Sequence, residues 1–329
     1  MTMTLTLGHI ELDVPFFQAA LSGYSDHAMR RLARQFGCPL TFTGVMLAKS
    51  MANPRVLRKA CFHPKPNEHP VGAQILSRTP ATMAAAARAL IDVGYDLIDL
   101  NFACPAPKVL RRRRGGALLD EPDLVTDIIK AVQDAVDCPI LLKLRIGVDH
   151  KPQSRENFWK IVQAAVDRKV TAIVIHGRTV TERYRGPANW DILAKVKQTY
   201  PHALIIGSGD VFDAQETIDR WRTSGLDGFV IARGAVGNPW IFPEFRAVLD
   251  GKSLPPAPSP EEQKRTMLKQ LEWILDGYPE KRAVGYFRKF LVGYVRRHPQ
   301  RKKALIEFMT IKTACNMRRA IERWYPDDT

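Results

Sequence analysis

The sequence predicts an α/β fold, a (β/α)8 TIM barrel followed by a small all-α helical domain. Short apolar runs, many of them β-branched, alternate with helical patterns through about the first 240 residues, as they do in such a barrel. A cluster of prolines then interrupts the pattern, and no strand-like alternation follows it. The length of 329 residues accommodates both parts.

Eight apolar runs are the predicted strands. They are Phe16–Ala20, Leu40–Thr43, Val71–Leu76, Asp96–Asn101, Ile140–Arg145, Thr171–His176, Ala203–Gly207 and Asp227–Ala232. An open, doubly wound sheet is the alternative arrangement of the same elements. No Gly-x-Gly-x-x-Gly motif follows the first strand, which weighs against the dinucleotide-binding form of that sheet, and we therefore favour the barrel.

Helix signals fill the segments between the strands. Ser25 or Asp26 can cap a helix that stops at Gly37, because polar side chains satisfy the first N–H groups and glycine ends helices. Thr79-Pro80 is an N-cap followed by a first-turn proline, and it predicts an alanine-rich helix to Val93. Apolar residues at helical spacing predict three further helices, Pro122–Val136, Phe158–Val166 and Asp213–Trp221.

The proline cluster predicts a domain boundary. Four prolines form a stiff, extended linker: Pro255, Pro256, Pro258 and Pro260. Acidic residues favour the first turn of a helix, and Glu261-Glu262 follows directly. We therefore predict a barrel domain over residues 1–253, a linker over 254–260 and a helical domain over 261–329.

Composition excludes several classes of protein. Hydrophobic content of 45% and charged content of 25% are ordinary for globular proteins and exclude a disordered, collagen-like or coiled-coil chain. The chain has no run of 18 apolar residues, and Met1–Ile10 lacks the features of a signal peptide. We expect a cytoplasmic protein without a membrane or protein partner, present as a monomer.

The five cysteines are odd in number and widely spaced, without a Cys-x-x-Cys motif. Neither a disulfide framework nor a metal site is expected. Cysteine is often a small buried apolar residue. We expect that role for all except Cys104, namely for Cys38, Cys61, Cys138 and Cys315.

The formal net charge of +15 indicates either a polyanionic partner, of which nucleic acid is the commonest, or a basic surface without a specific partner. The segment from Lys281 to Lys303 carries nine basic residues and no acidic one. Aromatic residues lie among these cations: Tyr286, Phe287, Phe290 and Tyr294. They are either stacking platforms for exposed bases or the core of the small domain, and the sequence leaves both interpretations open.

Polar residues end most of the predicted strands, and active residues of such barrels lie where strands end. Lys143 and His176 would project into the same mouth, where they suit charge stabilisation and proton transfer. Small turns follow the last two strands, Gly207-Ser208-Gly209-Asp210 and Ala232-Arg233-Gly234-Ala235. Their backbone N–H groups can bind one phosphate, and Arg233 adds positive charge.

These residues carry a family resemblance that spans nearly the whole chain. The chain resembles the tRNA-dihydrouridine synthases, FMN-dependent enzymes that reduce uridines in tRNA. The motifs are Asp99-x-Asn101-x-x-Cys104-Pro105, Arg114-Gly115-Gly116-Ala117-Leu118-Leu119, Lys143-x-Arg145, His176-Gly177-Arg178-Thr179, Tyr184-x-Gly186-x-Ala188-x-Trp190 and Arg233-Gly234-Ala235-Val236-Gly237-Asn238-Pro239-Trp240.

The resemblance implies a role for each residue at the mouth. Gln74, Lys143 and His176 would contact the flavin ring, and Asn101 would lie beside flavin and substrate. The backbone at Ala20, Leu21 and Ser22 would line the ring. Five residues would hold the ribityl phosphate: Ser208, Gly209, Asp210, Ala232 and Arg233. Arg178 would also belong to the cofactor site. The family usually has Pro-Met where this chain has Ala20-Leu21, and Asn where it has Ser208.

The resemblance also implies a mechanism and partners. Reduced FMN would give hydride to C6 of uracil, Cys104 would give a proton to C5, and NADPH would be the reductant. A thiol with a pKa of about 8.5 is mostly protonated at pH 7 and can act as an acid. The cations that would bind tRNA are Arg111, Arg112, Arg113 and Arg114 beside Cys104, with Arg288, Lys289, Arg296 and Arg297 in the helical domain.

Two alternatives to this function were weighed. An FMN barrel that reduces a free pyrimidine or oxidises dihydroorotate shares the site but leaves the basic helical domain unexplained. An RNA-binding protein without catalysis would explain the charge but not the joint presence of Asn101, Cys104, Lys143 and His176.

Overall fold

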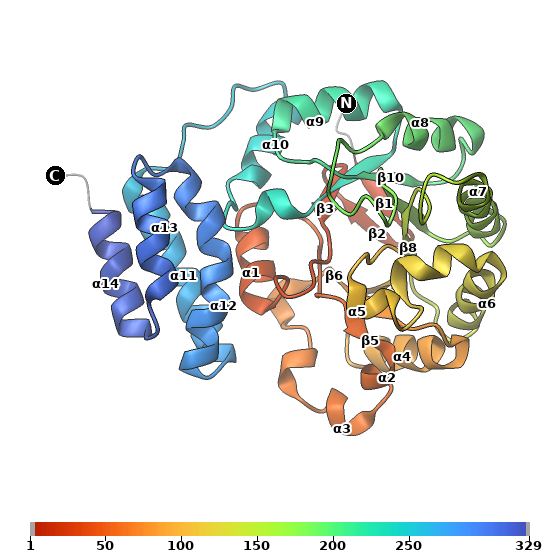
Figure 1. Ribbon diagram of the computed structural model, residues 1–329, viewed down its shortest axis with the longest axis horizontal. Coiled ribbons are helices and arrows are strands. Elements are labelled where there is room, and N and C mark those ends of the chain that lie inside the picture. The colour runs from red at the N-terminus through yellow and green to blue at the C-terminus, as the bar shows by residue number, and fades with distance from the viewer. Residues whose placement is uncertain (1–3, 327–329) are drawn as a thin grey trace.

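The computed structural model describes residues 4–326 and is built around a parallel barrel (Figure 1). The barrel strands are β3 (Phe16–Gln18), β4 (Thr41–Phe42), β6 (Val71–Leu76), β7 (Leu97–Asn101), β8 (Ile140–Arg145), β9 (Ala172–His176), β10 (Ile205–Ser208) and β11 (Gly228–Ile231). They pair in the order β3-β11-β10-β9-β8-β7-β6-β4, and the Gln18 N–H donates to the Leu40 carbonyl at 3.0 Å. That bond joins β3 to β4, so the predicted closed barrel is confirmed and the open sheet is excluded.

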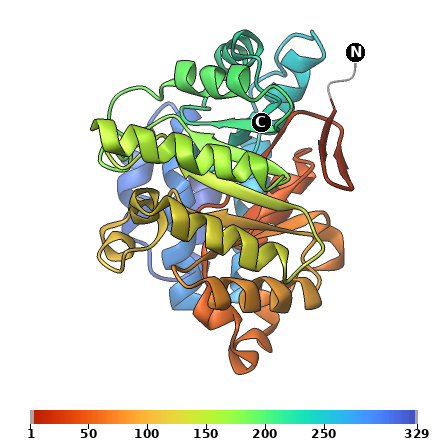
Figure 2. The ribbon, with the colours of Figure 1, turned by 90° about the vertical axis from the view of Figure 1, so that its right-hand side faces the viewer.

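Helices surround the barrel (Figure 2). They are α1 (His27–Gln35), α4 (Pro80–Asp92), α6 (Pro122–Gln133), α7 (Pro152–Asp167), α8 (Trp190–Thr199), α9 (Ala214–Ser224) and α10 (Ile241–Leu249). Shorter elements fill the loops: α2 (Ala48–Met51), α3 (Pro54–Leu57), α5 (Pro107–Leu110), strand β5 (Met46–Leu47), and 3-10 turns at Ala60–Phe62, Pro66–Glu68, Gly115–Asp120, Arg233–Ala235 and Val295–Arg297.

Four of the five predicted helix starts agree closely with the structure, and the start of α7 does not. Asp26 is the N-cap of α1, and its carboxylate accepts from the Met29 N–H at 3.0 Å. Ser25 instead accepts from the Leu21 N–H. α4 begins at Pro80, as the Thr79-Pro80 signal predicts. α7 begins six residues before the predicted start at Phe158, because its first turn is polar and shows no apolar period.

The inside of the barrel is apolar at one end and polar at the other. Leu97, Leu141 and Ile206 are buried in a cluster at the N-terminal ends of the strands. A hairpin that the sequence analysis did not predict, β1 (Leu5–Leu7) with β2 (Ile10–Leu12), adds its buried leucines to this cluster and closes that end. Because side chains alternate along a strand, the same interior face reaches polar residues at the opposite end, the mouth.

A helical domain packs against the barrel beside α1 (Figure 1). It consists of α11 (Pro260–Gly277), α12 (Glu280–Tyr294), α13 (Arg301–Thr310) and α14 (Ala314–Trp324). Residues 250–259 form neither helix nor strand. The first three residues of the predicted barrel domain and the last three of the predicted helical domain lie outside the described residues.

The contact between the two parts is close and partly apolar. Tyr24 of the barrel packs edge-on against Phe290 with ring centroids 5.8 Å apart, and Trp240 packs edge-on against Tyr294 at 6.0 Å. The Trp240 indole also donates to Glu262 at 2.7 Å. A Cβ on Gly293 of α12 would lie 1.8 Å from the Val236 carbonyl oxygen, so only glycine allows the two backbones to meet there.

Burial decides between the two interpretations of the aromatic residues and corrects one expectation about the cysteines. Phe287, Phe290 and Tyr294 are fully buried and Tyr286 packs partly buried against them, so these residues belong to the core of the small domain. Cys61 and Cys315 are exposed and are not small core residues, whereas Cys38 is buried. No helix in the described range, residues 4–326, combines the length and apolar character that a membrane crossing requires.

The close approach at Gly293 predicts a large effect of one methyl group. Gly293→Ala should destabilise the protein by about 2–4 kcal/mol, because backbone atoms on both sides would have to move. Thermal unfolding measures the loss. Gly285→Ala is the matched control on the same helix, since its Cβ would meet only the end of the Arg288 side chain at 3.6 Å. It should be neutral or stabilising by up to about 1 kcal/mol. Equal melting temperatures for the two variants would refute the constraint.

Candidate active site at the mouth of the barrel

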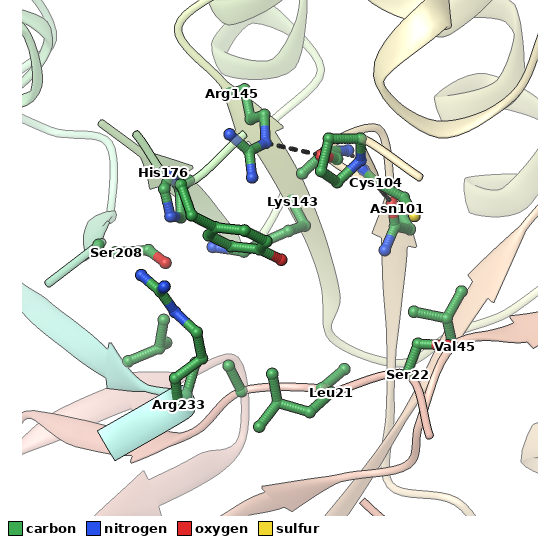
Figure 3. Close-up of a pocket in the computed structure, with 18 of the residues that line it drawn as sticks. Leu21, Ser22, Val45, Asn101, Cys104, Lys143, Arg145, His176, Ser208 and Arg233 are labelled. Atoms are coloured by element: carbon green, nitrogen blue, oxygen red, sulfur yellow. Dashed lines mark hydrogen bonds between the residues drawn. The ribbon is translucent and has the colours of Figure 1, made fainter. Parts of the chain in front are cut away.

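A cavity of about 830 Å³, counting the part open to solvent, lies at the C-terminal ends of the strands. Leu21, Ser22 and Val45 line one side of it, and Lys143, Arg145 and His176 line another (Figure 3). Every cofactor residue predicted from the sequence lines this cavity except Arg178, and so does Cys104. The strand register explains the convergence, because Asn101 pairs with Lys143, Arg145 with His176, and His176 with Ser208.

Two buried polar atoms face the mouth without a partner. The Lys143 Nζ and the His176 Nδ1 have no hydrogen-bond partner among residues 4–326. Burial lowers the pKa of Lys143, and the nearby Asp99 carboxylate opposes that shift. Burial lowers the pKa of His176 well below 6.5, and the charges of Arg145 and Lys143 lower it further. His176 is therefore neutral at pH 7, and both atoms are positioned to bind an uncharged or anionic ligand group.

Cys104 lies on the loop after β7, and the loop is held from two directions. The Asn101 Oδ1 accepts from the Cys104 N–H at 3.0 Å, and the Gly116 N–H donates to the Cys104 carbonyl at 3.1 Å. The buried Arg145 guanidinium donates to the Ala103 carbonyl at 2.8 Å and to the Thr179 carbonyl at 2.8 Å. This clamp fixes the thiol beside the polar strand ends.

Arg178 acts behind the cavity. Its guanidinium is buried and donates to the Asp210 Oδ1 at 2.7 Å, and the Ala188 N–H donates to the Asp210 Oδ2 at 2.7 Å. The pKa of Asp210 is lowered by these hydrogen bonds although burial alone would raise it. The pair fixes the turn after β10, in which Gly209 has φ +118°, and leaves the turn without excess negative charge.

The sequence analysis gave no role to several residues that line the cavity. Arg145 stands two residues after Lys143, and this spacing places both side chains on the same face of β8. Tyr184 belongs to a quoted motif, and its half-exposed ring lies 4.3 Å below the Arg233 guanidinium. Phe212 lies 5.2 Å from the same group. Nothing in the sequence singles out Phe212, because only the turn after β10 brings it to the mouth.

The predicted tRNA-binding cations differ in their surroundings. Arg111 and Arg112 are exposed in the turn after α5, whereas Arg113 pairs with Glu121 at 2.9 Å. Arg114 is half-buried and Arg296 is exposed. The Arg288 guanidinium donates to the Met309 carbonyl, and the Lys289 ammonium donates to the Gly23 carbonyl. Arg297 pairs with Glu244. The Lys289 contact brings α12 beside the Leu21-Ser22 edge of the cavity.

Within the described chain, no three His, Cys, Asp or Glu side chains come together as a metal site requires. The polar groups at the mouth offer hydrogen bonds and charge to a ligand. A thiol, carboxamides, an ammonium and a neutral imidazole all face one space.

Comparison with known proteins finds a family profile and relatives that carry the same description. A sequence profile of the family described as dihydrouridine synthase matches residues 17–322. The chain is 34% identical over 326 residues to a tRNA-dihydrouridine synthase B of Serratia marcescens, and the match covers 98% of this chain and 95% of that protein. It is 33% identical over 326 residues to a tRNA-dihydrouridine synthase B of Yersinia pestis, covering 98% and 99%.

The fold also resembles solved structures of low sequence identity. A 2-naphthoyl-CoA reductase in complex with 2-naphthoyl-CoA superposes with a TM-score of 0.59 at 11% identity, over 76% of this chain. The chain spans about half the length of that reductase, 52%. A likeness at this identity concerns the fold alone.

The lowered pKa of His176 predicts how stability depends on pH. The unfolded chain takes up a proton on His176 near pH 6.5 and the folded chain only well below it. The contribution of the neutral His176 to the free energy of unfolding is therefore fully present above pH 6.5 and is lost as the pH falls below it. Between pH 7.5 and 5.5, the free energy of unfolding should fall by about 1 kcal/mol more in the wild type than in His176→Gln.

Urea unfolding without added ligand at the two pH values measures this difference. The control is His202→Gln, since His202 is exposed on the barrel surface. Parallel behaviour of wild type and His176→Gln would show that His176 is not held neutral by its surroundings.

Proposed function

The chain belongs to the dihydrouridine synthase family, and from this premise we propose that it reduces uridines in tRNA to dihydrouridine, with FMN as cofactor and NADPH as reductant. The observation that supports this most is the mouth of the barrel, where the Cys104 thiol lies in one cavity with buried polar groups that lack protein partners. We also propose that the protein acts in the cytoplasm as a monomer.

The residues present at the mouth fit FMN. Lys143 and His176 offer a positive charge and a neutral imidazole to the flavin ring, and Gln74 and Asn101 offer carboxamides. Ala20, Leu21 and Ser22 would line the ring from the opposite side. The turns with Ser208, Gly209 and Asp210 and with Ala232 and Arg233 would hold the phosphate, because small turns present backbone N–H groups to anions. Arg178 would support this site through Asp210.

The chemistry follows from the electronics of uracil. Its C5=C6 bond is conjugated with the C4 carbonyl, so C6 accepts hydride and C5 then accepts a proton. When bound and reduced, FMN supplies the hydride. Cys104 donates the proton to C5 as general acid. Lys143 offsets the negative charge that develops next to it, and the Arg145 clamp keeps the thiol in position.

The substrate must reach this cavity from a folded RNA. A base in a barrel mouth has left its stack, and its phosphates must be held nearby. Arg111 to Arg114 follow Cys104 in the chain, and Lys289 joins α12 to the cavity edge. The basic helical domain thus continues the positive surface from the mouth. A free pyrimidine would need neither group of cations.

Replacement of the thiol tests the function and the role of Cys104 together. Cys104→Ala should keep the yellow flavin absorbance and tRNA affinity but lose at least about 100-fold in dihydrouridine formation, the typical contribution of a general acid. The assay uses FMN, NADPH and unmodified tRNA, with free uridine as a second substrate. Cys138→Ala, at the start of β8 and far from the mouth, is the control.

Several outcomes would contradict this proposal. Wild-type turnover by Cys104→Ala would remove the acid role from Cys104. Equal activity on free uridine and tRNA would favour a pyrimidine reductase. A colourless protein that binds RNA would favour a binding protein without catalysis.

The arginines beside Cys104 predict a change in salt dependence. Neutralising Arg111, Arg112, Arg113 and Arg114 to Gln should lower the slope of log affinity against log salt by about 2–3, because each phosphate contact contributes roughly 0.7–0.9. We expect these arginines to make fewer than four phosphate contacts, since Arg113 already pairs with Glu121.

The control removes the same number of charges from the helices that cover the barrel and from the turn after α7. It replaces Lys160, Lys169, Lys195 and Arg222, all exposed, by Gln. tRNA filter binding at several salt concentrations measures both variants. An unchanged slope in the arginine variant, or an equal change in the control, would refute the local contact.

A further inference from the structure

A chain of hydrogen bonds runs inside the barrel from Asp99 to the backbone of Cys104. The Gln74 Nε2 donates to the Asp99 Oδ2 at 2.7 Å, and the Asn101 Nδ2 donates to the Gln74 Oε1 at 2.6 Å. The Asn101 Oδ1 accepts from the N–H groups of Ala103 and Cys104 at 3.2 and 3.0 Å. Asp99 is only 4% exposed and lies below the cavity, whose lining includes both carboxamides.

The groups at the two ends of this series of hydrogen bonds determine which way the carboxamides of Gln74 and Asn101 are turned. A carboxamide has nearly equal ends, one that donates and one that accepts, and can turn over. An ionised carboxylate only accepts, so the NH2 of Gln74 must face Asp99. The oxygen of Gln74 then faces the NH2 of Asn101, and the oxygen of Asn101 faces the Cys104 N–H. Each carboxamide nitrogen keeps a second N–H that it can offer to a ligand in the cavity.

The same carboxylate compensates a buried cation. The Asp99 Oδ1 and the Lys143 Nζ are both buried and without hydrogen-bond partners among the described residues. Burial raises the pKa of Asp99 and lowers that of Lys143, and each group opposes the shift of the other. The nearby Arg145 repels Lys143 further. Asp99 lies on β7 two residues before Asn101, the register partner of Lys143 on β8, so it is a negative group placed next to Lys143 in the sheet.

We propose that Asp99 is the positioning residue of this site: it orients the carboxamides of Gln74 and Asn101 toward the cavity and is the counter-charge of Lys143. It acts through these three side chains and does not itself touch a ligand. The part that concerns flavin rests on the proposed function. The part that concerns Lys143 is a property of the chain alone and is tested without any ligand.

The first test is a thermal unfolding cycle on the protein without added flavin at pH 8. Lys143→Met leaves the Asp99 carboxylate buried without its cation, which is costly. Adding Asp99→Asn to Lys143→Met gives a double variant from which that carboxylate is removed. The double variant should therefore melt at a higher temperature than Lys143→Met alone. Additive effects of the two single changes would overturn the counter-charge role.

The second test compares flavin affinities by fluorescence titration. Asp99→Leu removes the acceptor and should weaken FMN binding by about tenfold, the equivalent of one or two hydrogen bonds. Asp99→Asn keeps an acceptor oxygen for Gln74 and should restore most of this loss. Thr41→Val is the control, since the Thr41 hydroxyl is buried, has no partner in the described chain and lies outside the cavity.

Riboflavin, which lacks the phosphate, separates ring contacts from phosphate contacts. Asp99→Leu should weaken riboflavin and FMN by the same factor, whereas Arg233→Gln should weaken FMN alone. Wild-type affinity in Asp99→Leu, or Asp99→Asn as weak as Asp99→Leu, would overturn the orienting role. A wild-type chain that binds neither flavin would overturn the proposed function and this orienting role together, while the thermal cycle decides the counter-charge role separately.

Discussion

The arrangement of the mouth depends on a lysine whose side-chain nitrogen is buried inside a barrel. An ammonium removed from water is strongly destabilised unless charges and hydrogen bonds compensate it. Burial lowers the pKa of His176, and the charges of Arg145, Lys143, Arg178 and Arg233 around it lower that pKa further, so the imidazole is neutral. Asp99 and Asp210 are the acids that oppose these cations. The site therefore has a positive excess, and an anionic ligand would complete it.

The two acids compensate different parts of the site. Asp210 is bound by Arg178 and the Ala188 N–H, so its charge is used to fix a turn and not to repel a phosphate. Asp99 lies deeper, and its hydrogen bonds extend through Gln74 and Asn101 to the Cys104 backbone. The surroundings of Lys143 and the position of the Cys104 backbone are thereby connected through one carboxylate. A change at Asp99 would therefore affect both.

Much of this architecture could be predicted because barrel strands are buried on both faces. β6, β7 and β8 are apolar runs without competing patterns, and the predicted ends lie within one residue of the observed ones. The hairpin β1–β2 escaped prediction because a single apolar-polar-apolar alternation in three residues is too short to indicate a strand. The Arg178–Asp210 pair and the role of Asp99 depend on which residues face each other across strands and loops. Sequence spacing places such residues near the mouth but cannot say which of them touch.

The predicted tRNA-binding cations differ in how far they are already engaged by contacts within the protein. Several predicted tRNA contacts are partly used within the protein: Arg113 pairs with Glu121, Arg297 pairs with Glu244, and Lys289 binds the Gly23 carbonyl. These contacts hold loops and domains in place, as Gly293 does by its lack of a side chain. The exposed Arg111 and Arg112 are therefore better placed than the paired cations to meet phosphates. The net charge of +15 therefore does not give the number of phosphate contacts, which depends on how many cations the fold leaves exposed near the mouth.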